Sequence, residues 1–350
     1  MKFTPPRYPT ISEMAAIDVG RLTEDEVRDQ FERIRWPLGT TCPNCGSKNV
    51  TKLSANATSH QTSTRDGVIQ CNECRKQFTV TIGTIMERSH ITLRQWIQAF
   101  YTFCEHKKGI SALQLQKKLG LGSYRSAWFM LQRIRNAMGN DTMFNLLKGD
   151  NEIDETYIGG SVRKENKPVT TETYNENLQF EFPHEDNHEK TEEKKNKRGR
   201  GAKKNIVGVI VSRDGGVAVA KPLENVSAKS LHLFIKKHVD PTSTIITDEW
   251  TGYNGIGKDF DGGHLTVNHG SGEYTRGKAY TNNAESFFAT MKRGIFGTYH
   301  HLSKKYLPLY CYEFGFRWSH RKMKPGEVTE HAIRLMLDRK ITMRVLRSCG

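Results

Sequence analysis

The stretch TNNAESFFATMKRG, residues 281–294, has the apolar spacing of an amphipathic helix. Four apolar residues recur at i, i+3, i+4 and i+7 and therefore share one face: Ala284, Phe287, Phe288 and Met291. Glu285 and Lys292 are seven residues apart, so they project together from another side. Gly294 and Gly297 are expected to end the helix. The segment thus predicts a helix with one packing face and a separate side that carries a carboxylate and an amine.

Glu285 has two interpretations. In the first, Asn282 caps the helix and Glu285, at the third helical position, reaches back to it in a capping box. In the second, Glu285 and Lys292 belong to a functional site. The segment alone favours the capping box, but two further acidic residues upstream and a strongly basic chain favour the site.

Two predicted strands carry these further acids. The run from Asn151 to Gly160 alternates and ends at glycines, which predicts a strand with Glu152 and Asp154 on the same face. Acidic residues inside a strand are disfavoured, so we interpret Asp154 as a functional candidate rather than an edge-strand charge. Asp248 follows the apolar run Thr244–Thr247, and the sites of α/β proteins form just beyond the carboxyl ends of buried strands.

The order of the predicted elements suggests how these acids meet. A strand with Asp154, a hairpin of two strands, a helix, a strand ending at Asp248, a short strand and the helix with Glu285 form a ribonuclease H-like α/β order. Like charges packed together are costly unless a cation holds them. We therefore expect the three carboxylates to bind two Mg²⁺ (or Mn²⁺) ions, which suit oxygen ligands and phosphodiester chemistry. Lys292 would position a phosphate beside them.

Two CxxC pairs precede this domain. Each pair lets two thiolates bind one ion, and two pairs complete a closed tetrahedral site. The odd total of seven cysteines also favours metal over disulfides. We therefore predict a zinc ribbon with one structural Zn²⁺, for which the alternative is chance or redox-active pairs. Its ligands would be Cys42, Cys45, Cys71 and Cys74.

Residues 89–147 predict three helices with glycine-containing turns, which is a helix-turn-helix pattern. Thr92 and Ser123 stand where N-caps are expected. Three arginines of the third helix are expected to point at least partly outward, toward phosphates or base edges: Arg125, Arg133 and Arg135. The alternative is a three-helix spacer with a solvated basic face.

The chain of 350 residues carries a formal net charge of +15. This charge favours a polyanionic partner, nucleic acid before membrane, because no basic amphipathic helix or lipidation signal stands out. A soluble protein that is simply basic is the alternative. The sequence has no signal peptide and no long apolar run, so we expect a cytoplasmic protein in a reducing compartment.

Motifs and composition divide the chain into four regions. An N-terminal helical segment covers residues 1–38, and a zinc ribbon covers residues 39–88. A helix-turn-helix-like DNA-binding region follows at residues 89–147, and a ribonuclease H-like domain at residues 148–345. Residues 161–204 form a charged insertion with few apolar side chains, which cannot bury a core. Its basic end, residues 194–200, would follow a phosphate backbone or remain a solvated loop.

Several groups of residues occur together in a distinctive order. They are Arg35–Pro37 before Cys42–Cys45, then Asp154–Gly160, Thr247–Trp250 with Tyr253, and Thr281–Phe288 running into Lys292–His301. In combination they resemble the motifs of the IS1595-type (ISXO2-like) insertion-sequence transposases, and the resemblance covers nearly the whole chain except the insertion. It implies a DDE-type recombinase in which Asp154 and Asp248 are the first two metal ligands.

The resemblance leaves two residues for the third ligand. Related sequences have an Asn-x-x-Glu pair here, which corresponds to Asn282 and Glu285. We favour Glu285, because a carboxylate binds Mg²⁺ better than an amide and because its spacing to Lys292 is that of DDE enzymes generally. Asn282 would then be an accessory ligand, and Lys292 and Arg293 would contact DNA.

The implied function is a DNA transposase that binds terminal inverted repeats, cuts a phosphodiester to free a 3′-OH and joins that end to target DNA. Its partner would be double-stranded DNA, bound by a homodimer or larger assembly, with no membrane and no small-molecule substrate. One alternative is a domesticated, non-catalytic DNA-binding protein; another is a ribonuclease H-like nuclease acting on hybrids or branched DNA. The presence of all three acids and Lys292 favours the transposase.

Overall fold

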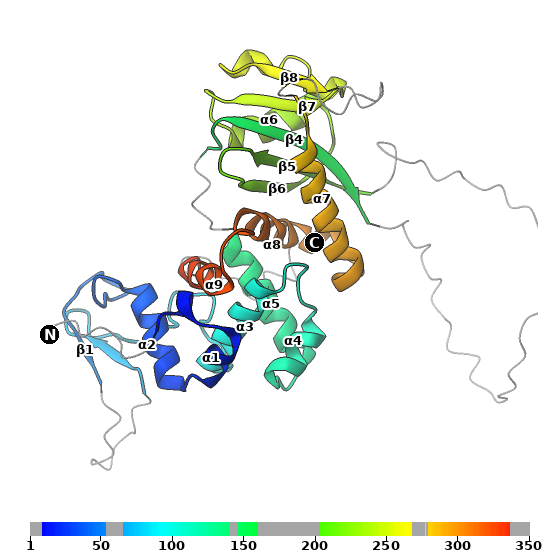
Figure 1. Ribbon diagram of the computed structural model, residues 1–350. Helices are drawn as coiled ribbons and strands as arrows, with labels where there is room; N and C mark the ends of the chain where they lie inside the picture. The colour runs from blue at the N-terminus through cyan, green and yellow to red at the C-terminus, as the bar shows by residue number, and fades with distance from the viewer. Residues whose placement is uncertain are drawn as a thin grey trace, which may run out of the picture.

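The computed structural model describes residues 9–53, 66–139, 146–159, 204–267, 277 and 279–336. The predicted insertion lies outside these ranges, apart from its last residue. In Figure 1 a small ribbon of strands and a group of helices occupy one half of the molecule, and a larger sheet occupies the other. No helix in the described ranges has the length and apolar character needed to cross a membrane.

The N-terminal part combines two short helices with a small antiparallel sheet. Its elements are α1 (Ala16–Arg21), α2 (Glu24–Arg35), β1 (Val50–Lys52), β2 (Ile69–Cys71) and β3 (Gln77–Phe78). The backbone N–H of Glu26 donates to Thr23, and that of Thr23 donates to Glu26, so α2 begins with a capping box. The ring of Trp36, at the end of α2, packs edge-on against Phe78 with centroids 6.0 Å apart. The ribbon is therefore fixed to α2 by apolar contact.

Three further helices form the predicted helix-turn-helix region. They are α3 (Leu93–Glu105), α4 (Ala112–Leu119) and α5 (Tyr124–Met138). Thr92 accepts from the Gln95 N–H and Ser123 from the Ser126 N–H, which confirms both predicted N-caps. Gly120 ends α4 in the left-handed conformation, with φ of 61°, that favours glycine.

Helix α9 (Pro325–Arg334) joins these helices from the other end of the chain. Val328, Ala332 and Ile333 are buried in one apolar core together with residues of α1–α5 and of the zinc ribbon. The backbone N–H of Ile85 also donates to the Met336 carbonyl at 3.1 Å. We call α1–α5 with α9 the helical unit. The sequence assigned residues 148–345 to one domain, but α9 packs in the helical unit because its apolar face matches that core.

The larger sheet has five strands in the order β6-β5-β4-β7-β8. The strands are β4 (Asp150–Ile158), β5 (Asn205–Ser212), β6 (Ala218–Leu223), β7 (Thr244–Asp248) and β8 (His264–Val267). Strand β5 runs antiparallel to β4 and β6, whereas β7 is parallel to β4 and β8. The β5–β6 hairpin and the strand carrying Asp154 are therefore as the sequence predicts.

Helices cover both faces of this sheet. Helix α6 (Ala228–His238) packs on the face that carries Ile153, whereas α7 (Asn282–Gly294) and α8 (Leu307–Ser319) pack on the face that carries Ile158. Successive side chains of a strand point to opposite faces, so Glu152 and Asp154 share the face of α7 with Ile158. We call β4–β8 with α6–α8 the sheet unit.

Helix α8 lies between the five-stranded sheet and the helical unit (Figure 1). Its residues Cys311, Phe314 and Trp318 belong to the core of the sheet unit, whereas Phe316 belongs to the core of the helical unit. A Cβ placed on Gly315 would lie 3.1 Å from the Ala218 carbonyl oxygen of β6, a tight contact, so glycine favours this close approach. One helix thus contributes to both cores.

Candidate active site

The pairing of β4 with β7 brings Asp154 and Asp248 to equivalent positions. Glu152 lies opposite Ile246 in this parallel ladder, and Asp154 and Asp248 each follow two residues further along their strands. Neighbouring strands are about 4.8 Å apart, and residues two apart point to the same face. The two aspartates therefore stand on the face covered by α7.

The surroundings of Asp154 are negatively charged. Its Oδ1 accepts a hydrogen bond of 2.7 Å from the Glu155 N–H. Burial is the largest cause of a raised pKa of Asp154, which reaches about 8. Three neighbouring carboxylates raise it further: Glu155, Asp248 and Glu285. The residues predicted as a triad therefore interact electrostatically, although they come from three different elements.

Hydrogen bonds orient the carboxylates of Asp248 and Glu155. Oδ1 of Asp248 accepts from the Trp250 N–H at 3.0 Å, just beyond the end of β7. Glu155 points to the opposite face of β4, where the hydroxyl of buried Tyr253 donates to it at 2.7 Å. The sequence grouped Tyr253 with the Asp248 motif but did not predict this contact, because the partner residues are about a hundred positions apart.

Helix α7 does not begin with the capping box that was one interpretation of its sequence. Thr281 is the N-cap residue, and no side chain of the helix's own first turn caps it. Instead, a carboxylate oxygen of Glu152 on β4 accepts from the backbone N–H of Asn283 at 2.7 Å and of Ala284 at 3.2 Å. The observed cap comes from a distant strand, and Asn282 is the first residue of the helix rather than its N-cap.

Helix α7 presents the remaining predicted site residues near the sheet. Asn282 and Glu285 are exposed on its first turn, Lys292 is half-buried and Arg293 is exposed. The α-helix ends at Gly294, but a π-helical turn, Ile295–Tyr299, follows directly and runs past Gly297. A Cβ on Gly294 would lie 2.6 Å from the Phe314 ring and 2.8 Å from the Lys108 carbonyl oxygen. Gly294 therefore also allows close packing at the end of the helix.

The two predicted metal sites differ in their geometry. Within the described residues, one group of three or more metal-binding side chains has all its donor atoms within 4.8 Å of one another, and it consists of Cys42, Cys45, Cys71 and Cys74. Two of the sulfur–sulfur distances are 3.6 Å, close to the value of about 3.8 Å for four sulfurs that surround Zn²⁺ tetrahedrally. The cysteines therefore fit zinc. Asp154, Asp248 and Glu285 interact electrostatically, but their carboxylate oxygens do not all lie within 4.8 Å of one another.

The three arginines predicted to contact DNA have different surroundings. Arg125 is exposed at the start of α5, and half-buried Arg133 lies over the Phe129 ring at 4.4 Å. Arg135 is buried, and its Nε donates to Glu313 of α8 at 2.6 Å. The prediction that Arg135 contacts DNA was therefore wrong, because the helix face it occupies is covered by α8.

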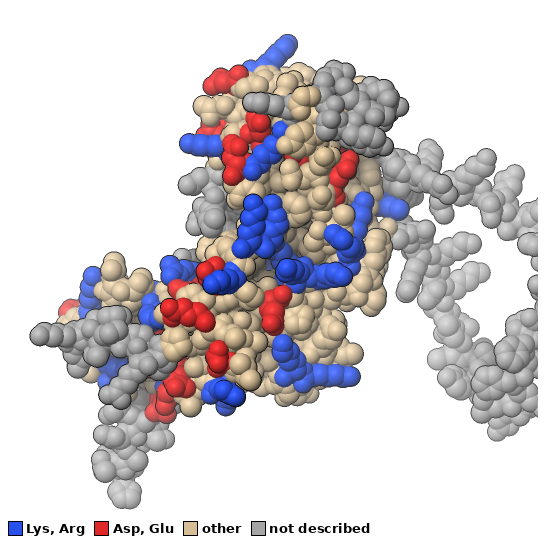
Figure 2. Space-filling view, viewed as in Figure 1, with Lys and Arg blue, Asp and Glu red and all other residues tan. Residues whose placement is uncertain are grey.

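Positively charged side chains concentrate between the two units. In Figure 2 lysines and arginines gather on the surface where the sheet unit meets the helical unit. Lys107 and Lys108 are exposed in the turn after α3, and this turn touches α7 at Gly294, beside exposed Arg293. The basic surface thus continues from α7 to the helical unit.

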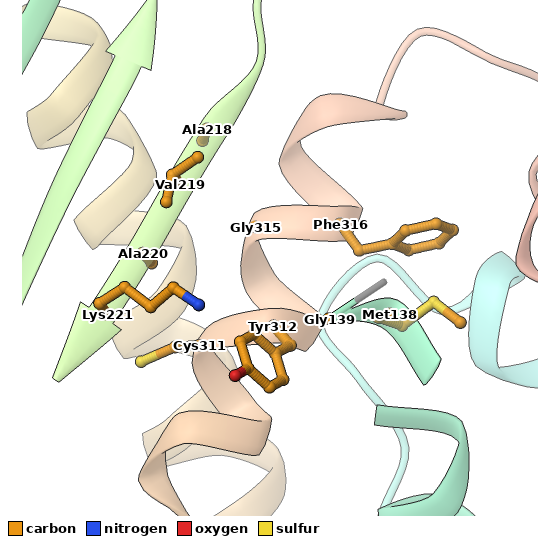
Figure 3. Close-up of a pocket in the computed structure, with 10 residues that line it drawn as sticks. All are labelled: Met138, Gly139, Ala218, Val219, Ala220, Lys221, Cys311, Tyr312, Gly315 and Phe316. Carbon is orange, nitrogen blue, oxygen red and sulfur yellow. The ribbon is translucent and has the colours of Figure 1, made fainter. Parts of the chain in front are cut away.

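A small cavity lies between β6, α8 and the end of α5 (Figure 3). Its volume is about 40 Å³, and none of the residues that line it is acidic. Such a space holds at most a few water molecules. The cavity is therefore not a substrate pocket, and the acidic residues on β4, β7 and α7 remain the candidate active site.

Comparisons with known proteins support a transposase role. The ISXO2-like transposase domain family matches residues 146–319, and the transposase zinc-ribbon domain family matches residues 22–77. Both matched models describe IS1595-type, ISXO2-like transposases, so the chain carries a zinc ribbon and a transposase domain of that type. The match to the transposase zinc ribbon confirms that prediction and, with the four cysteines, supports a structural Zn²⁺.

One relative comes from a mobile element. A Halobacterium salinarum protein described as an uncharacterized protein in transposable element ISH50 is 25% identical over 299 residues. The alignment covers 85% of this chain and 91% of that protein. No solved structure matches the chain.

Proposed function

We propose that the chain is the DDE transposase of an insertion sequence, which cuts double-stranded DNA at the element's ends and joins them to target DNA. The observation that carries this proposal is the register of β4 and β7, with Asp154 and Asp248 at equivalent positions beneath α7. The match to the ISXO2-like transposase domain and a relative in a transposable element support the same function.

The strand order also supports a ribonuclease H-like domain. A sheet ordered β6-β5-β4-β7-β8, with β5 antiparallel and helices on both faces, has the arrangement expected of that fold. In it, two neighbouring central strands and one helix supply the acids. We infer that β4, β7 and α7 have these roles here.

We infer that Asp154, Asp248 and Glu285 hold two Mg²⁺ or Mn²⁺ ions, with Asn282 as an accessory ligand. The donor set fits hard cations, and the mutual repulsion at Asp154 is what a bound cation would relieve. When bound, such ions activate a nucleophile and stabilise the leaving oxygen of a phosphodiester. Glu285 contributes to the raised pKa of Asp154, which supports its placement among the ligands.

Basic residues would hold the DNA across both units. Lys292 and Arg293 extend from the same helix as Glu285, and Lys107 and Lys108 continue the positive surface. Lysine and arginine contacts to phosphates position DNA without reading its sequence. Arg125 and, over the Phe129 ring, Arg133 remain proposed contacts of α5. We propose that a homodimer or larger assembly brings the two DNA ends together.

The proposal is tested with duplexes that end in the inverted repeats flanking the reading frame. Asp154→Asn and Asp248→Asn preserve side-chain shape but remove the charge, so we expect Mg²⁺-dependent cleavage to fall by about a thousandfold or more while binding changes by less than about threefold. Cleavage of the duplex and gel-shift affinity are the measurements.

The substrate and the variants separate the alternatives. Wild-type protein that binds the repeats but never cuts them is a non-catalytic DNA-binding protein. Preferential cutting of RNA–DNA hybrids or branched DNA indicates a nuclease. Cleavage at the wild-type rate by Asp248→Asn would reject the assigned site.

A further inference from the structure

We propose that Glu152 is a positioning residue for the active site. Its carboxylate anchors the N-terminus of α7 to β4 and so sets where Glu285 stands relative to Asp154. This role rests on the function proposed above and adds a residue that is not one of the three acids. It is assigned from contacts that join two of the three elements of the site.

The carboxylate of Glu152 is buried and fully occupied. One oxygen accepts from the backbone N–H groups of Asn283 and Ala284, and the other accepts from the Asn283 side chain at 2.8 Å. That second oxygen also accepts from Arg213 Nε at 2.7 Å. A carboxylate offers about four acceptor positions, so these four bonds leave none for a metal ion. Glu152 therefore acts on the helix and not as a ligand.

Arg213, the residue that follows β5, makes further contacts that anchor the start of α7 to β4. Its Nη2 donates to the Tyr280 carbonyl at 2.6 Å, and its guanidinium lies over the Tyr280 ring, 3.5 Å from the centroid. Its own backbone N–H donates to the Asp150 carbonyl of β4 at 2.9 Å. The segment that enters α7 is thus tied to the strand of Asp154 through two side chains.

Glu152 contacts the first turn of α7, and the position of this turn determines where Glu285 lies. A negative group at a helix N-terminus accepts from otherwise unpaired N–H groups and interacts favourably with the helix dipole. Asn282 and Glu285 lie on the same turn as these N–H groups. The apolar face of α7 would hold the helix on the sheet without Glu152, but a shift of its first turn by about 1 Å is enough to lower catalysis strongly.

The principal test is Glu152→Gln, which retains size and loses the charge. Amide exchange of the peptide covering residues 281–288 should become about tenfold faster, since the cap is weakened. At saturating DNA the cleavage rate should fall by about tenfold or more, and the Mg²⁺ concentration giving half the maximal rate should rise. Affinity for the inverted-repeat duplex should change by less than about twofold.

Glu313→Gln is a matched control, because Glu313 is an equally buried carboxylate that pairs with arginines away from the three acids. At a temperature where both variants are folded, it should keep the cleavage rate within about threefold. Arg213→Lys is the second variant if Glu152→Gln fails to fold. Lysine keeps a charge near Glu152 but lacks the planar fork that also reaches Tyr280, so we expect a smaller loss of cleavage.

Three results would overturn the proposal. One is cleavage at the wild-type rate by Glu152→Gln, or by Arg213→Lys where only that variant folds. Another is unchanged amide exchange at residues 281–288. The third is an equal loss of cleavage in Glu313→Gln, which would indicate general destabilisation. If Asp154→Asn and Asp248→Asn also cleave normally, the proposed function itself fails; normal cleavage by the anchor variants alone rejects only the positioning role.

Discussion

Asp154 carries the electrostatic cost of the site at the scale of single residues. Burial and three neighbouring carboxylates favour its neutral form and raise its pKa to about 8. A protein retains such an arrangement where a cation or a substrate group offsets the repulsion. Glu285 is the most exposed of the three predicted ligands, so its contribution is the one that most needs a direct measurement.

Substitutions at Glu285 and Asn282 distinguish which of the two residues is the third metal ligand. We expect Glu285→Gln to lower Mg²⁺-dependent cleavage by about a hundredfold or more, because an amide is a poor replacement for a carboxylate ligand. Asn282→Ala should lower it by less than about tenfold, as expected of an accessory ligand. Cleavage rates over a Mg²⁺ titration provide the measurement. A larger loss in Asn282→Ala would make the asparagine the third ligand.

The predictability of the site from sequence varies with the distance between partners. Thr23, Thr92 and Ser123 were identifiable as caps because each accepts from a residue three positions away. The cap of α7 was not predictable from its own segment, because its acceptor, Glu152, is 131 residues upstream. A signal was present, since Glu152 was predicted on the same face as Asp154, but no local rule pairs a strand carboxylate with a helix N-terminus.

At the scale of elements, the junction of α7 and α8 depends on close packing. Gly294 brings α7 against the Phe314 ring of α8 and the backbone after α3. The π-helical turn that follows places the Tyr299 hydroxyl 2.5 Å from Glu313, which accepts its hydrogen bond. The sheet unit therefore meets the helical unit through the end of the helix that carries Glu285.

Gly294→Ala tests this packing. The added Cβ would lie 2.6 Å from the Phe314 ring and 2.8 Å from the Lys108 carbonyl oxygen. We expect the free energy of unfolding to fall by about 1–3 kcal/mol, because this backbone oxygen and ring have little room to move. Urea unfolding gives the value. Gly297→Ala is the control: no atom lies within 4 Å of its added Cβ, so a change beyond about 0.5 kcal/mol would contradict the explanation.

Local patterns predicted most elements but not their partners. The acidic strand, the β5–β6 hairpin and the helices of the helical unit follow from periodicity and turn residues. The burial of Arg135 and the placement of α9 depend on contacts with α8 and with the N-terminal core. A helix surface that is polar in sequence is indistinguishable from a solvated one when its ionic partner lies 178 positions away.

At the scale of the whole molecule, a buried ionic cluster joins the two units. Glu313 of α8 pairs with Arg135 of the helical unit at 2.6 Å and with Arg317 at 2.7 Å. Arg317 also donates to the carbonyls of Phe103 and His106 in the helical unit. The relative position of the units is therefore fixed by charge-assisted hydrogen bonds as well as by apolar packing.

Glu313→Gln should lower the free energy of unfolding by about 3–5 kcal/mol, because it leaves buried arginines without their anion. Chemical denaturation at neutral pH gives the value. Asp259→Asn removes the partner of Lys236 from an ion pair of 2.9 Å whose side chains are 38% and 48% exposed, respectively. This control should cost less than about 1 kcal/mol. Equal losses in the two variants would argue against the special importance of the buried cluster.

The effect of Glu313 should also depend on pH. Burial alone would raise the pKa of Glu313, but Arg135 and Arg317 together lower it below the ordinary value of 4.5. A lowered pKa stabilises the folded state above the unfolded pKa, and this contribution disappears as pH falls through the folded value. The stability difference between wild type and Glu313→Gln should therefore shrink below about pH 4.5, whereas a constant difference would exclude this electrostatic origin.

The position of α9 has a consequence for dividing or recombining the chain. A fragment that stops before Pro325 would leave the apolar side of α3 exposed to water and prone to aggregate. A stable, separately expressed helical unit would thus need both α1–α5 and α9, with the intervening sheet unit replaced by a linker. Chimaeras between relatives would likewise need to take the first and last segments from the same parent.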